Sequence, residues 1–306
     1  MSAPPPEAIR AVPVRHWGRW VGAILVLALL TWLVESAIRS QFVDFAEVRR
    51  WQFSSLILSG LWATIVLATL AQAAGIVLGV IFAVMRLSKN PVMSGLSWFY
   101  IWFFRGTPVL VQLFFWFNGV PSVFRTLTIA IPFTDVTLYS TPMVQFMTPF
   151  MAAFLGLSLN EGAYMAEIVR AGILSVDEGQ VEASHALGMT PGLTMRRVVL
   201  PQAMRVIIPP TGNEFISMLK TSSLASVVLL EELLRVSQNI YSSNLKNLEL
   251  LIVASIWYLV LTTVASIGQY YLERRFARGA ARELPETPIQ RIRRNLAIRT
   301  RARIED

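Results

Sequence analysis

Long apolar segments alternate with short polar segments along this chain of 306 residues. About 20 consecutive apolar residues are enough for a helix to cross the hydrocarbon core of a bilayer, and longer segments tilt or extend into water. The pattern predicts six such helices, at residues 17–38, 54–85, 94–118, 144–173, 202–230 and 250–272. The predicted fold is therefore that of an all-α, polytopic integral membrane protein.

Composition and charge agree with a membrane protein. Hydrophobic residues make up 54% of the chain and charged residues 15%, whereas soluble domains carry about 25% charged residues. If the N-terminus is cytoplasmic, most of the 27 Lys and Arg residues fall on the cytoplasmic side, including ten arginines between Arg274 and Arg303. This bias places both termini and the polar segment 174–203 in the cytoplasm, although the Arg49-Arg50 pair runs against it.

The sequence makes separate predictions for the N-terminal and C-terminal segments of the chain. Residues 1–16 are expected to form a cytoplasmic segment, and residues 17–53 an extra transmembrane helix with its linker. A cleavable signal peptide is the alternative for this first helix, but no small-x-small site follows it at Glu35-Ser36-Ala37-Ile38-Arg39. Residues 277–306 are expected to form a basic cytoplasmic tail. Its arginines either satisfy the charge bias alone or attract anionic lipid, at about 1 kcal/mol per basic residue.

The most informative segment is the polar stretch at residues 174–203, between the fourth and fifth predicted spans. Val181, Ser184, His185 and Gly188 are three or four residues apart, so they share one face of a helix that a partner groove could approach closely. Gly188 followed closely by Pro191 is typical of a helix stop. The segment therefore predicts two short helices that meet at a bend.

The spacing in this segment resembles the EAA loop of ABC importer permeases. Glu182-Ala183-Ser184 is followed after three residues by Gly188, after nine more by Val198, and then by Leu200-Pro201. Ser184 stands where the family has Ala, and Val198 where it has Ile. Both changes are small and conserve volume.

Three further runs narrow the resemblance to the permeases for polar amino acids, the histidine/glutamine/glutamate/arginine group. They are FRGTPVLVQ at 104–112, LNEGAYMAE at 159–167 and GNEFISMLK at 212–220, in the family order around the EAA loop. Two features depart from the family: Thr221-Ser222-Ser223-Leu224 stands where Asp-Thr-Ser-Leu is more usual, and the outer segment 119–148 is longer. These departures concern substrate and receptor contacts.

The resemblance implies an architecture and a set of partners. The domain at residues 54–276 would be a type I ABC importer permease core of five helices, with the N-terminal helix as a sixth. It would pair with an identical or similar permease subunit in the bacterial cytoplasmic (inner) membrane. Two ABC ATPase subunits would dock on the EAA loops, at Glu182, Ala183, Ser184, Gly188, Leu200 and Pro201. An extracytoplasmic amino-acid-binding protein would deliver the substrate, and transport would proceed by alternating access.

No catalytic or metal site is expected within the chain itself. It has no cysteine and only two histidines, which makes a Cys/His zinc cluster untenable. No Gly-x-x-x-x-Gly-Lys-Ser/Thr run occurs, so ATP and Mg would be bound by the partner subunits, and this chain needs no cofactor of its own.

Polar residues within the predicted spans are the candidates for a substrate path, because charged groups in a bilayer are costly. Glu161 or Glu214 could accept the ammonium group of an amino acid, and Arg105 or the hydroxyls of Ser222 and Ser223 could bind its carboxylate. Pro209-Pro210 predicts a disrupted helix whose free backbone groups would bind the substrate. The full candidate set is Arg105, Asn160, Glu161, Glu214, Ser217, Lys220, Ser222 and Ser223.

Structural roles for these residues remain open from the sequence. Arg105 could form an ion pair with Glu161 or Glu214 that holds the bundle together. The run 105–108 could instead be a kink, with Gly106 permitting close helix approach. Gly75 and Gly79 form a Gly-x-x-x-Gly helix-contact motif of low specificity.

Other classes of function fit less well. A secondary amino-acid transporter is the alternative, but the chain shows no inverted repeat. A channel would need a selectivity filter or a row of gating arginines, and the sequence shows neither. The aromatic stretch 98–117 is better explained by lipid contact than by nucleic-acid stacking. The sequence does not indicate which amino acid is carried, or whether the permease pair is homodimeric or heterodimeric.

Overall fold

The structure is a computed structural model, and it describes residues 17–39, 43–131, 134 and 136–277. The predicted segment 1–16 and nearly all of the tail 277–306 therefore lie outside the described residues. The main helices are α1 (Trp17–Arg39), α2 (Phe45–Gln52), α3 (Ser55–Leu87), α4 (Pro91–Gly106), α5 (Val109–Phe114), α8 (Pro149–Leu174), α9 (Glu178–Ala186), α11 (Leu200–Thr221), α12 (Leu233–Asn244) and α13 (Asn247–Ala277).

Shorter elements connect these helices. They are a π-helical turn at Phe115–Gly119, α6 (Val120–Val123), the strands β1 (Thr126–Ala130) and β2 (Thr137–Pro142), α7 (Met143–Phe146), α10 (Pro191–Thr194), a second π-helical turn at Met195–Val199 and a 3-10 helix at Ser222–Val228. The predicted helical fold is confirmed, and by length and hydropathy α3 and α13 are the described helices that could each cross a membrane.

The third predicted span is not one helix, as the apolar run 94–118 had suggested. α4 ends at Gly106, Thr107 is extended with φ −105° and ψ 140°, and α5 begins at Val109. Pro108 explains the break, because a residue that precedes proline is driven out of the helical region. The prediction of a kink at 105–108 is thus confirmed, but among the described residues no atom lies within 4 Å of where a Gly106 side chain would begin, so no other helix of this chain approaches closely there.

In the fifth predicted span, the helix is continuous where the sequence predicted a break. α11 runs without interruption through Pro209 and Pro210, so the predicted disruption there is wrong, and it ends at Thr221 rather than near residue 230. Each proline leaves one backbone carbonyl of the preceding turn without its N–H donor. The neighbouring α13 supports this region, since Gln269 Nε2 donates to Pro209 O at 3.2 Å.

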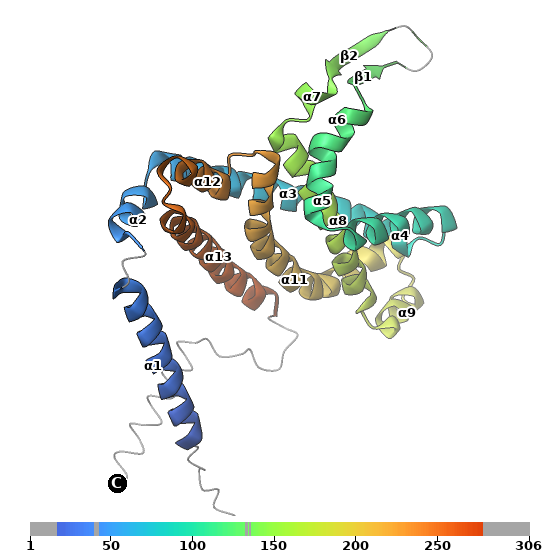
Figure 1. Cartoon of the computed structure of the whole chain (residues 1–306). Coiled ribbons are helices and arrows are strands. Elements are labelled where there is room, and N and C mark those ends of the chain that lie inside the picture. Colours follow the sequence, from blue (N-terminus) through green and yellow to red (C-terminus); the bar gives the residue numbers. More distant parts are fainter. Residues whose placement is uncertain (1–16, 40–42, 132–133, 135, 278–306) are drawn as a thin grey trace, which may run out of the picture.

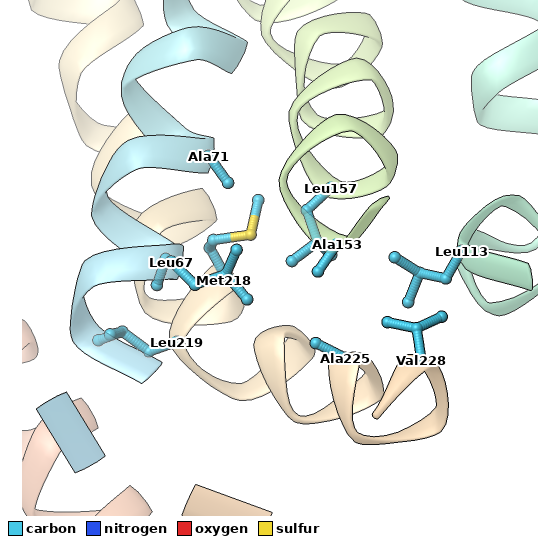
Figure 2. Close-up of a cluster of buried hydrophobic side chains, with 10 residues drawn as sticks. Leu67, Ala71, Leu113, Ala153, Leu157, Met218, Leu219, Ala225 and Val228 are labelled. Carbon is cyan, nitrogen blue, oxygen red and sulfur yellow. The ribbon is translucent and has the colours of Figure 1, made fainter. Parts of the chain in front are cut away.

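The core lies between α3 and α8, which form the most extensive helix pair among the described elements. Added methyl groups at Gly75 and Gly79 would overlap Glu161 and Met165 on α8, so both glycines are needed for the close approach of the two backbones. Figure 2 shows the adjoining apolar cluster, to which α3, α5, α8, α11 and the 3-10 helix contribute Leu67, Ala71, Leu113, Ala153, Leu157, Met218, Leu219, Ala225 and Val228.

The two N-terminal helices, α1 and α2, differ in how they contact the bundle. α1 lies apart from the bundle in Figure 1 and exposes apolar side chains such as Trp20 and Leu25, as expected of a helix that contacts lipid. α2 packs on the bundle through Val48. Its N-cap, Asp44, accepts from the backbone N–H groups of Glu47 and Ala46 and pairs with Lys246, and the hydrogen bond from Glu47 is the main reason that the pKa of this carboxyl is lowered.

The outer segment 119–148 contains a feature that the sequence did not predict. β1 and β2 form an antiparallel hairpin that projects from the bundle in Figure 1. α8 connects this hairpin to α9 at the other end of the molecule, about 39 Å away for 26 helical residues.

Candidate functional site: an exposed elbow and a polar cavity

The segment that joins α8 to α11, together with the last residue of α8 and the first four residues of α11, is named the elbow, residues 174–203. The side chain of Asp177 caps α9 by accepting from Gly179 N at 2.9 Å. At the other end of α9, Gly188 adopts the left-handed region with φ +76°, and its N–H donates to His185 O while Met189 N donates to Ser184 O. This pair of bonds is a Schellman motif, for which glycine is the preferred residue. The prediction of two short helices, α9 and α10, that meet at a bend is confirmed.

Ser184 lies inside the elbow rather than on its surface. Its side chain is buried, its hydroxyl donates to Val181 O at 2.7 Å, and it lies 2.9 Å from the hydroxyl of Thr194 on α10. The prediction that this position faces a partner groove is therefore wrong, because the hydroxyl instead joins the two short helices.

The other predicted coupling residues are exposed. Glu182 and Ala183 lie on α9, Gly188 lies in the turn that follows it, and Leu200 and Pro201 lie at the start of α11. Leu187, next to Gly188 in the bend, is 82% exposed.

The hydroxyl pair inside the elbow can be tested by a double-mutant cycle. We expect Ser184→Ala alone to lower the free energy of unfolding by about 1 kcal/mol, because the buried Thr194 hydroxyl loses a partner. The double variant with Thr194→Val should be less destabilised than the sum of the single variants. Thermal unfolding of the three variants in detergent measures this, and strict additivity would show that the two hydroxyls do not interact.

The second feature is a cavity of about 310 Å³ within the bundle. Its walls come from α5, α8 and α11, and its lining residues are Val109, Leu157, Asn160, Glu161, Tyr164, Glu214, Ser217, Met218 and Thr221. The predicted candidates Asn160, Glu161, Glu214 and Ser217 therefore share one space. Such a volume suits a small polar molecule.

Glu161 is the most deeply placed acidic residue of the cavity, with 5% of its surface exposed. It accepts a hydrogen bond of 2.9 Å from Gln72 Nε2 on α3. Glu214 faces the same cavity from α11 and is half-buried. Two carboxylates at one cavity repel each other in a poorly solvated site, so a bound cation would be stabilised there.

The break after α4 is joined to this cavity by two amides. Asn160 Nδ2 donates to Phe104 O at 2.8 Å, and Gln112 Nε2 donates to Phe104 O and Thr107 O at 3.0 and 3.1 Å. These bonds satisfy carbonyl groups that the ended helix leaves free. Asn160 therefore both lines the cavity and supports the backbone of the third predicted span.

Arg105 does not form the predicted ion pair. Within the described part of the chain, no bridge of 4.0 Å or less joins it to Glu161 or Glu214, so this prediction is wrong. Its guanidinium carbon instead lies 5.1 Å from the ring centre of Tyr164, a cavity residue. Arg105 itself is exposed and does not line the cavity.

The remaining three candidates also lie outside the cavity lining. Lys220 is exposed beside it on α11. Ser222 is fully buried, and its hydroxyl donates to Leu219 O at 2.9 Å rather than lining the cavity. Ser223 lies in the 3-10 helix that follows α11 and is not among the lining residues.

Several participants were not singled out from the sequence. Gln72, Gln112 and Tyr164 make the contacts described above. A signal existed for the two glutamines, because a single amide within an otherwise apolar span is costly unless it finds a partner. No comparable signal marked Tyr164, since aromatic residues are common in membrane spans.

Known proteins resemble this chain over most of its length. Residues 75–278 match the family described as "Binding-protein-dependent transport system inner membrane component". The arginine transport system permease protein ArgU of Corynebacterium glutamicum is 47% identical over 284 residues, which cover 92% of this chain and 88% of that protein. The glutamine transport system permease protein GlnP of Escherichia coli is 33% identical over 225 residues, covering 74% of this chain and 94% of that protein.

A solved structure agrees with these relatives. The crystal structure of an amino acid ABC transporter with histidines has a chain of 36% identity and a TM-score of 0.65, and the match covers 76% of this chain and 99% of that one. The molecule is thus a polytopic helical component of a membrane transport system. The chain belongs to the family of inner-membrane components of binding-protein-dependent transport systems. The sequence prediction of an ABC importer permease is confirmed over the secondary transporter.

Proposed function

We propose that this chain is the permease subunit of an importer that carries a polar amino acid through the cavity between α5, α8 and α11. Two ABC ATPase subunits, which bind ATP and Mg, would drive it from the elbow. An extracytoplasmic binding protein would supply the substrate, and a second permease subunit would complete the path. The chain would cross the bacterial cytoplasmic membrane several times and would hydrolyse no ATP itself.

One observation carries this proposal: the two helices that supply most of the cavity lining also enter and leave the elbow. α8 contributes Asn160, Glu161 and Tyr164 to the cavity and ends at Leu174, where the elbow begins. α11 contributes Glu214, Ser217 and Thr221, and its first residues, Leu200 and Pro201, close the elbow. Force applied to the exposed surface of α9 would therefore move both walls of the cavity.

The chemistry of the cavity supports a polar amino acid as the substrate. Carboxylates accept hydrogen bonds from an ammonium group, and the amide of Asn160 and the hydroxyls of Ser217 and Thr221 can donate to a carboxylate. Two relatives are named for polar amino acids, arginine and glutamine. Alternating access requires two arrangements of these walls, one open to each side of the membrane.

Removal of one cavity charge tests the proposal. We expect Glu214→Gln to raise the KM for uptake of its amino acid at least tenfold, which corresponds to about 1.4 kcal/mol. Uptake is measured in proteoliposomes that hold the permease, its ATPase subunits and its binding protein. Glu47→Gln is the matched control, because Glu47 lies on α2 away from the cavity. Wild-type affinity and rate in Glu214→Gln would remove this residue from the path.

A further inference from the structure

The β1–β2 hairpin and the short helices α6 and α7 at its base form an exposed surface at the opposite end of α8 from the elbow (Figure 1). Among the described residues the sheet has two strands, so each outer edge presents backbone N–H and C=O groups without a strand partner. Open strand edges do not occur in the hydrocarbon of a bilayer, because lipid offers these groups no hydrogen bond. The hairpin therefore lies in water or against another protein.

The hairpin nevertheless exposes large apolar side chains. Ile129 and Tyr139 lie opposite each other on the two strands and are 51% and 49% exposed, and Leu138 is 66% exposed. The segment 126–148 contains a single charged residue, Asp135. Exposed apolar clusters mark contact sites for proteins or membranes, and the open strand edges exclude the hydrocarbon of the membrane. A protein partner is therefore the occupant that fits this surface.

The base of the hairpin is fixed to the rest of the molecule. Met143 N donates to Arg125 O at 2.9 Å, and the hydroxyls of Thr128 and Ser140 lie 3.3 Å apart across the two strands. Leu127 packs against a buried cluster that includes Met143. The exposed apolar side chains are therefore presented by a shaped element of the fold.

A groove of about 640 Å³ lies at the base of the hairpin. Its walls come from the first π-helical turn, α6, α7 and the start of α8, and none of its lining residues carries a charge. Phe117, Val144 and Pro149 give it an apolar lining. The exposed amides of Asn118 and Gln145 can donate to and accept from the backbone of a partner. The groove thus has the same uncharged character as the hairpin.

The groove lies outward of the substrate cavity on the same two elements of the fold. Phe117, in the π-helical turn that continues α5, lines the groove, whereas Val109 on α5 lines the cavity. Pro149, the first residue of α8, lines the groove, and Leu157 lines the cavity about 12 Å further along the helix. With the elbow in the cytoplasm, the groove and the hairpin lie on the extracytoplasmic side of the cavity. This is where a protein that passes an amino acid into the cavity from outside would bind.

We propose that the β1–β2 hairpin and the groove at its base dock the extracytoplasmic binding protein, through an uncharged apolar patch on that protein whose largest side chain enters the groove. This inference rests on the proposed function, and it adds where that partner binds and by what chemistry. Docking covers Ile129, Leu138 and Tyr139, and the amides at the groove bind the partner's backbone. Because no charged side chain takes part, docking depends on apolar burial and little on salt.

Two matched pairs of variants test the proposal on the permease–ATPase complex in nanodiscs, with the purified binding protein carrying its amino acid. Leu138→Asp should weaken equilibrium binding of the binding protein at least tenfold, because it places a charge in an apolar contact. Leu245→Asp is its control, since Leu245 is an 83% exposed leucine at the end of α12, and binding should stay within about twofold of the wild type. Val144→Trp should fill the groove and weaken binding at least tenfold. Val123→Trp should not, because Val123 is also 71% exposed but does not line the groove.

Two further measurements identify the occupant and the chemistry. Binding should change less than about threefold between about 0.1 and 1 M sodium chloride, over which the Debye length falls from about 10 to 3 Å. A photo-crosslinking side chain in place of Tyr139 should capture the binding protein. A loss of binding above tenfold in salt, or capture of a second permease copy or of lipid instead, would overturn the inference. Wild-type binding in both Leu138→Asp and Val144→Trp would also overturn it and leave the proposed function standing, whereas uptake that needs no binding protein would overturn both.

Discussion

Substitution of Gly188 by valine is expected to reduce uptake at least tenfold while the protein still inserts into the membrane. Gly188 has φ +76°, a region that costs an L-residue about 1–2 kcal/mol and a β-branched one more. The two Schellman bonds that end α9 would be strained or lost, so the surface around Glu182 and Leu187 would no longer have one fixed orientation. Uptake into proteoliposomes with the ATPase subunits measures this effect.

The control for this variant lies in the same elbow. Gly192 in α10 has no positive φ and no atom within 4 Å of a would-be side chain. Gly192→Val should therefore retain most of the uptake. Equal loss in both variants would mean that the elbow tolerates no added bulk anywhere, and full activity of Gly188→Val would show that the bend has no part in coupling.

Substitution of Gly79 by leucine is expected to destabilise the helix bundle by about 3 kcal/mol, the upper end of the usual cost of overpacking. An added side chain would meet Met165 and the backbone of α8 near Ala166, and a backbone cannot move aside as a flexible side chain can. Because α3 and α8 would separate, the bond from Gln72 to Glu161 would also be lost. Thermal unfolding in detergent reports the change.

Gly95→Leu is the matched control for that variant. Gly95 lies on the exposed surface of α4, with no atom within 4 Å of the position of a side chain. It should unfold at close to the wild-type temperature. If Gly79→Leu were as stable as Gly95→Leu, the close approach of α3 and α8 would not be a requirement of the fold.

The sequence predicted the elbow well because its signals are local. A Schellman motif depends on one glycine and its immediate neighbours, so Gly188 and Pro191 were sufficient to place the bend. The burial of Ser184 was not predictable in the same way, because it depends on the packing of α9 against α10. Helical spacing shows which residues share a face, but it does not show which face is inside.

The two proline sites of the spans illustrate a further limit. Pro108 breaks its helix whereas Pro209 and Pro210 do not, although sequence rules treat all three as helix breakers. Distant residues contact both sites: Gln112 and Asn160 satisfy carbonyls of the broken span, and Gln269 on α13 donates to Pro209 O. Tertiary contacts of this kind cannot be derived from local propensity.

Some of the residues that line the cavity could be predicted from the sequence. The cost of a charge or amide in a bilayer marked Glu161, Glu214 and Asn160 as functional or paired, and they share one cavity. The same cost marked Arg105 and Lys220, which lie beside it. Only the path of the backbone shows that Arg105 reaches the ring of Tyr164 rather than either carboxylate.

The most direct test of the account compares ATP hydrolysis with uptake when the elbow is replaced. Residues 177–199 are exchanged for a flexible Gly/Ser linker of equal length in the complete transporter, reconstituted in liposomes with its ATPase subunits and binding protein. The account predicts that membrane insertion persists, that uptake is abolished, and that the amino acid no longer stimulates ATP hydrolysis. ATP-driven uptake at the wild-type rate would contradict it, because the walls of the cavity would then move without the segment that connects them to the ATPases.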